Sequence, residues 1–167
     1  MKAIAFDKIL LKTAFCCMAS DGHIDSREVE IIKDLCNKSN YFNDFNFIKE
    51  IQQLVEEINQ DTNSFIVDFL KILDGQEFTL DEELNIIKFS IETIKADDCI
   101  EYSEIKFFKV LRRHLKVENE IILEYYPDIE NLLQVDIGKP ELIVDFIQSH
   151  EMPDFLKIDF SLLEDKD

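Results

Sequence analysis

The chain has 167 residues, of which 46% are hydrophobic, and its 36 carboxylates outnumber its 18 Lys and Arg, for a formal net charge of -18. This charge excludes nucleic acid as the main ligand and disfavours docking on an anionic membrane, because both need a basic surface. Only three glycines and three prolines are present, too few for the turns of a sheet-rich fold, so the composition predicts an all-α protein.

Seven helices are predicted along 3–126 from the 3.6-residue spacing of apolar side chains. The first, 3–19, and the fifth, 80–95, are apolar on nearly all sides, as the central helices of a bundle are. A capping box, Thr79-x-x-Glu82, opens the fifth helix. The remaining helices are expected at 26–38, 47–58, 63–73, 103–115 and 118–126.

An internal repeat aligns 20–29 with 96–105, an offset of 76 residues. Each copy consists of a buried helix, an acidic turn and an amphipathic helix. Two such helical hairpins, related by a pseudo-twofold axis, predict one compact bundle of about seven helices.

The acidic surplus is concentrated toward the C-terminus. Residues 118–167 hold 14 acids and 3 bases, a net charge of 3 minus 14, or -11. Because Tyr126-Pro127 breaks the helical pattern, we divide the chain into a helical domain, 1–126, and an acidic C-terminal extension, 127–167. Apolar clusters predict that the extension is partly docked, with a helix near 140–149.

A cytoplasmic location is predicted from the cysteines and the N-terminal residues. Charged side chains interrupt the apolar N-terminal stretch, which is therefore a poor signal peptide, and no run of 18 apolar residues exists. The four cysteines show no C-x-x-C spacing, which is typical of a reducing compartment: Cys16, Cys17, Cys36 and Cys99.

The first acidic turn, Asp21-Gly22-x-Ile24-Asp25-x-x-Glu28, is similar to the second half of an EF-hand calcium loop, in which Gly makes the sharp turn and the last Glu chelates. The first half of such a loop is missing from both copies. Its first and third ligand positions fall on side chains unsuited to calcium: Cys17 and Ala19 in one copy, Thr93 and Lys95 in the other. A true EF-hand is therefore not expected.

Two interpretations of the acidic turns stay open. In the structural one, Asp25 and Glu28 form a capping box, Ile24 packs on Val29, and left-handed Gly22 closes the preceding helix; in the second copy Ile100 and Ile105 keep the apolar contact. Capping does not explain the aspartates at the C-terminal ends of two helices, where the macrodipole disfavours them by about 0.3–1 kcal/mol. The other interpretation is a divalent-cation site for Ca²⁺ or Mg²⁺, with these metal ligands: Asp21, Glu28, Asp97 and Glu104.

No catalytic machinery is predicted. The histidines are scattered, and no nucleophile or general base stands in a recognisable pattern. An enzyme with paired carboxylates and a metal remains a further alternative, but it lacks the usual Glu-x-x-His ligands. One basic patch is interpreted as a solvated face: Lys109, Arg112, Arg113 and Lys116.

The duplicated pattern resembles the TerB family of bacterial tellurite-resistance operons and the related N-terminal region of the DjlA co-chaperones. The matching residues are Ala14-x-x-x-x-Ala19-Ser20-Asp21-Gly22-x-Ile24-x-x-x-Glu28 and Ala96-Asp97-Asp98-x-Ile100-x-x-x-Glu104. The resemblance covers 3–126 and departs from the family at Asp98, where Gly is common. It implies an all-helical bundle with acidic residues that hold a divalent metal, no catalysis, and protein partners in stress-response assemblies near the membrane. The lack of a long apolar run separately predicts that the chain does not insert into the membrane.

Overall fold

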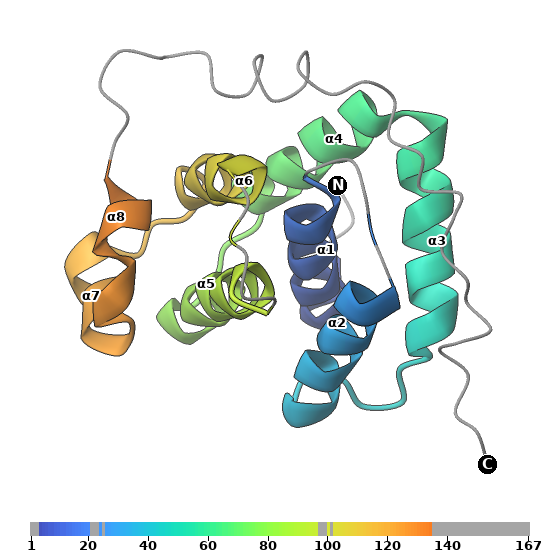
Figure 1. Ribbon diagram of the computed structural model, residues 1–167, viewed down its shortest axis with the longest axis horizontal. Coiled ribbons are helices and arrows are strands. Elements are labelled where there is room, and N and C mark those ends of the chain that lie inside the picture. The colour runs from blue at the N-terminus through green and yellow to red at the C-terminus, as the bar shows by residue number, and fades with distance from the viewer. Residues whose placement is uncertain (1–3, 21–23, 25, 97–99, 101, 135–167) are drawn as a thin grey trace.

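The computed structural model describes residues 4–20, 24, 26–96, 100 and 102–134. Every regular element of this part is a helix, which confirms the all-α fold (Figure 1). In chain order the elements are α1 (Phe6–Ala19), α2 (Ser26–Lys38), α3 (Phe47–Gln60), α4 (Thr62–Gly75), α5 (Leu80–Ile94), α6 (Tyr102–Arg112), α7 (Asn119–Tyr125), the 3₁₀ turn η1 (Pro127–Ile129) and α8 (Glu130–Leu133).

All seven predicted helices are present, and their ends lie within about three residues of the predicted ones. The sixth ends at Arg112 rather than at 115, because the chain tightens into a turn whose hydrogen bonds run from His114 N–H to the Leu111 carbonyl and from Leu115 N–H to the Arg112 carbonyl. The short helical segment at 127–133 was not predicted. Proline is well tolerated at the start of a helix, so Pro127 ends one helical stretch and begins the next.

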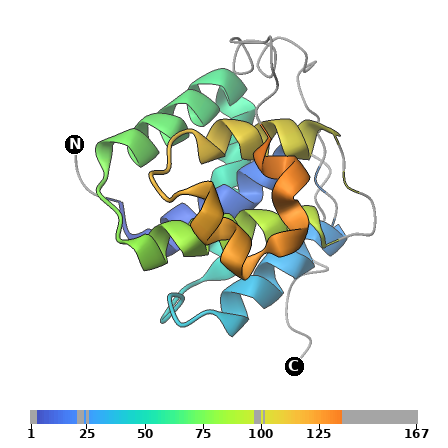
Figure 2. The ribbon, with the colours of Figure 1, turned by 90° about the vertical axis from the view of Figure 1, so that its left-hand side faces the viewer.

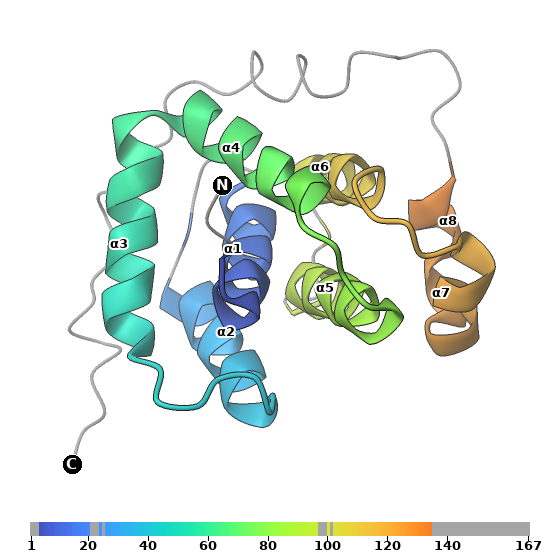
Figure 3. The ribbon, with the colours of Figure 1, turned by 180° about the vertical axis from the view of Figure 1, so that it is seen from behind.

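Helices α1 and α5 pack lengthwise against each other and form the centre of the bundle. Helices α2 and α6 lie on opposite sides of this pair, and each contacts both of its members (Figures 1 and 3). Two hairpins related by a pseudo-twofold axis would make these contacts, because α1 would correspond to α5 and α2 to α6. The predicted duplication therefore has a structural counterpart.

The central position of α1 and α5 in the core explains why their sequences are apolar on nearly all sides. Ten of the 14 residues of α1 are buried, and the large aromatic side chains fill the space around them. Each fully buried Phe contributes roughly 1.5–3 kcal/mol through the removal of apolar surface from water. Four phenylalanines are 0% exposed: Phe15, Phe69, Phe107 and Phe108.

Polar side chains satisfy the free backbone N–H groups at three helix starts. The predicted capping box is confirmed, because Thr79 N–H donates to Glu82 at 2.8 Å and Glu82 N–H donates to Thr79 Oγ1 at 3.3 Å. Asn46 accepts from Lys49 N–H at 3.1 Å, and Asp61 accepts from Ser64 N–H at 2.9 Å. Such caps contribute about 1 kcal/mol each.

The first residues after α7 pack against the helical domain beside α6 (Figure 2). Ile129 is 1% exposed, and Asp128 makes an ion pair with Lys95 at the end of α5. The rest of the acidic extension, including the helix expected near 140–149, lies outside the described residues. No described helix combines the length and the apolar character needed to cross a bilayer.

Asp44, in the connection between α2 and α3, has a φ of 55°, which is left-handed backbone that favours glycine. We expect Asp44→Gly to change the free energy of unfolding by less than about 0.5 kcal/mol, because relieved strain offsets the greater freedom of the unfolded chain. Asp44→Val should lower it by more than about 1 kcal/mol, since β-branched residues resist positive φ. Urea denaturation measures both; equal losses would assign the cost to the aspartate side chain instead of the backbone.

Candidate functional site

Two of the four predicted metal ligands, Glu28 and Glu104, lie within the described residues. Glu28 is half-buried in the first turn of α2, and Glu104 is 6% exposed in the first turn of α6. Each is the third residue of its helix, so the repeat places the two carboxylates at equivalent positions. Asp21 and Asp97, the other two ligands, lie outside the described residues, as do Gly22 and Asp25.

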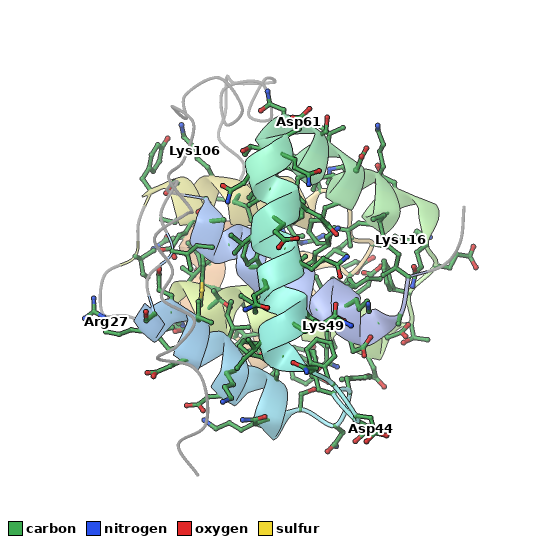
Figure 4. The ribbon with its side chains drawn as sticks, turned by 90° about the vertical axis from the view of Figure 1, so that its right-hand side faces the viewer. Arg27, Asp44, Lys49, Asp61, Lys106 and Lys116 are labelled. Atoms are coloured by element: carbon green, nitrogen blue, oxygen red, sulfur yellow. The ribbon has the colours of Figure 1, made fainter. Side chains whose placement is uncertain are left out.

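The starts of α2 and α6 lie at the same end of the bundle. Figure 4 shows Arg27, next to Glu28, and Lys106, in the first half of α6, both toward its left-hand side. The central pair α1 and α5 nevertheless lies between the two helices (Figure 1). Glu28 and Glu104, the two described ligands, therefore stand on helices that the central pair separates.

Glu104 adjoins a buried thiol at the end of α1. Burial raises the pKa of Cys17 well above its ordinary value, and the charges of Cys16 and Glu104 raise it further, whereas a hydrogen bond with Ser90 opposes them. Burial also raises the pKa of Cys16 and of Cys36 to about 12. These three thiols are therefore protonated at neutral pH.

The apolar contacts of the two turns differ. In the first copy Ile24 and Val29 are 4% and 0% exposed, as the structural interpretation requires. In the second copy Ile100 is 47% exposed and Ile105 is only half-buried. The two turns therefore differ in burial, and the contact expected between Ile100 and Ile105 stays a prediction.

Carboxylate oxygens suit a hard divalent cation, and a first-turn carboxylate also interacts favourably with the positive end of the helix dipole. Within the described part of the chain, no three His, Cys, Asp or Glu side chains gather so that they could hold a metal ion. Since Asp21 and Asp97 lie outside that part, only the glutamate of each turn is described. A complete site requires the aspartates.

The interpretation of the basic patch as a solvated face is wrong for Arg112. Its guanidinium is half-buried and donates to the Leu115 carbonyl at 3.0 Å, to Asn119 Oδ1 at 3.0 and 3.1 Å, and to the Val117 carbonyl. Burial lowers the pKa of Arg112, and the negative charge of Glu83 opposes this shift. Arg112 thus organises the connection between α6 and α7.

Glu83 completes this connection from α5. It is 4% exposed, and its Oε2 accepts the backbone N–H of Val117 at 2.5 Å. The sequence does not single it out, because Asp81 and Glu82 are acidic residues of the same first turn. Glu83 and Arg112 together form a largely buried polar cluster, which ties the connection between α6 and α7 to α5.

Comparison with protein-family models, with curated proteins and with solved structures finds no match to this chain. The likeness to the TerB family therefore rests on the duplicated turn residues, and what it implies about function enters only as a proposal.

Proposed function

We propose that the chain is a non-enzymatic helical binding module of the TerB type, which acts in a cytoplasmic stress-response assembly and holds a divalent cation at its acidic turns. The observation that supports this most directly is the repeated glutamate: Glu28 and Glu104 occupy the same position in α2 and α6, whose starts lie at one end of the bundle. In this proposal the partners are other proteins, including membrane-associated components of a tellurite-resistance-like system.

The chemistry of the turns suits Ca²⁺ or Mg²⁺, since both prefer carboxylate oxygens. Asp21 with Glu28, and Asp97 with Glu104, would each supply two carboxylates to one ion. So few charged ligands correspond to weak calcium sites, with dissociation constants of about 0.1–1 mM.

A purely structural or scaffolding protein is the second candidate. In it the acidic turns act only as helix caps, and a specific observation favours it: three other helices of this chain begin with polar caps, at Asn46, Asp61 and Thr79. Such a protein needs no ion.

Thermal unfolding distinguishes the two candidates. We expect CaCl₂ or MgCl₂ to raise the Tm above its value in NaCl of equal ionic strength, because a cation that binds only the folded state stabilises it by mass action. At ten times the dissociation constant the stabilisation is about 1.4 kcal/mol. Asp21→Asn combined with Asp97→Asn should abolish the divalent-specific rise.

A matched control removes two exposed carboxylates elsewhere, through Asp34→Asn with Glu77→Gln. This control should keep the rise, because it changes only the net charge. Equal Tm values in all three salts for the wild type would contradict the cation site and leave the capping account in place.

A further inference from the structure

A groove runs between the C-terminal end of α2, the connection that follows it and the middle of α5. It has a volume of about 700 Å³, within the usual range for ligand-binding pockets. Lys38, Ser39 and Tyr41 line it on one side, and Asn85 and Lys88 line it on the other. Phe89, which is 2% exposed, is also among the lining residues.

The groove is rich in hydrogen-bond donors and cations on a chain that is otherwise strongly acidic. Lys38 is exposed and makes no ion pair with any described residue, and the ammonium of Lys88 reaches Glu92 only at 4.0 Å. Ser39 Oγ accepts the Tyr41 N–H at 3.3 Å, which leaves its hydroxyl proton free to donate. Glu92 is the one acidic residue among the lining side chains. This surface complements a segment that carries carboxylates beside apolar side chains.

The chain itself contains such a segment. Residues 135–167 hold nine acids and three bases, a net charge of 3 minus 9, or -6. Aspartates stand directly before aromatic residues in Asp154-Phe155 and Asp159-Phe160. Carboxylates of this stretch could pair with the two lysines while an aromatic ring packs on Tyr41, which is 38% exposed.

The extension also starts close to the groove. Asp128 pairs with Lys95 at the end of α5. Burial raises the pKa of Tyr126, and the charge of Glu92, a residue that lines the groove, raises it further, so Tyr126 lies near Glu92. The 33 residues from 135 to 167 span up to about 110 Å when extended. Tethering gives an effective concentration of about 1 mM, so docking with an intrinsic dissociation constant well below about 1 mM would be mostly occupied.

We propose that the groove between α2 and α5 is a docking site for the chain's own acidic C-terminal segment around 154–165, whose carboxylates pair with Lys38 and Lys88. A partner that uses the groove must then displace this segment, so its recognition surface is acidic as well. This proposal does not depend on the cation site, and the two are tested by different variants.

Hydrogen–deuterium exchange of the full chain tests the proposal. Backbone amides of 154–165 should exchange at least about tenfold more slowly than those of a free peptide of the same sequence. Lys38→Glu with Lys88→Glu should bring the exchange to within about twofold of the free peptide, because charge reversal repels the segment. Adding Asp154→Lys with Asp159→Lys should restore the protection.

The matched control is Lys49→Glu with Lys116→Glu, which reverses two exposed lysines that do not line the groove (Figure 4). It should keep the wild-type protection at the same net charge. Exchange as fast as the free peptide in the wild type, or protection that survives Lys38→Glu with Lys88→Glu, would overturn the proposal. Protection that rises with protein concentration would overturn it too, by identifying a second copy as the occupant.

Discussion

Glu83→Ala is expected to lower the free energy of unfolding by about 3 kcal/mol in urea denaturation. Glu83 is 4% exposed and accepts the Val117 N–H at 2.5 Å, and hydrogen bonds to charged groups contribute about 1.5–3 kcal/mol. The substitution also removes the negative charge that offsets the burial of Arg112. It thus leaves a buried donor without its acceptor and a half-buried cation without a nearby negative charge.

Two further variants locate the source of this loss. Glu83→Gln keeps an oxygen acceptor for Val117 but removes the charge, so we expect a loss of about 1 kcal/mol. Glu77→Ala removes an exposed carboxylate just before α5 and should change stability by less than about 0.5 kcal/mol. A loss below about 1 kcal/mol for Glu83→Ala would show that the connection between α6 and α7 holds without this carboxylate.

The helices could be predicted because their signals are local. Apolar side chains recur every three or four residues along the chain, and the Thr79 and Glu82 side chains mark the start of α5 within four residues of sequence. The central position of α1 and α5 could also be predicted, because only helices covered on most sides need be apolar on most sides. The 76-residue repeat then indicated that α1 corresponds to α5 and α2 to α6.

The roles of Arg112 and Glu83 could not be predicted, because they depend on tertiary placement. Arg112 and Arg113 are neighbours of one residue type, yet Arg113 is exposed while Arg112 is half-buried. What separates them is the path of the connection to α7, which brings the carbonyls of Leu115 and Val117 back over Arg112. No spacing of residues in the sequence indicates that the chain turns back over Arg112 at this point.

The sequence predicted that Glu28 and Glu104 occupy equivalent positions, but it did not predict how deeply each is buried. Glu28 and Glu104 occupy equivalent turns, yet Glu104 is buried beside Cys17 while Glu28 is half-buried. Ile24 and Ile100 likewise align in sequence and differ in burial. A repeat fixes the register of two helices, whereas burial depends on what packs over each copy, and the two halves of this chain are covered by different elements.

Ala14→Leu is expected to lower the free energy of unfolding by about 2–3 kcal/mol, because it overpacks the contact between α1 and α5. Ser90 on α5 makes a hydrogen bond with Cys17 on α1. The 76-residue repeat equates Ala14 with Ser90 and Cys17 with Thr93, so the pseudo-twofold places Ala14 beside Thr93. None of these four side chains is more than 3% exposed.

Small residues on both helices therefore let the two backbones approach closely at this point, and the core there has no space for three more carbon atoms. Ala5→Leu is the matched control: Ala5 is exposed just before α1, and the same substitution there should change stability by less than about 0.5 kcal/mol. Chemical denaturation of both variants measures the difference. If Ala14→Leu costs less than about 1 kcal/mol, the helices are far enough apart at this position to accept a leucine, and close approach of α1 and α5 is not what fixes the geometry of the two hairpins.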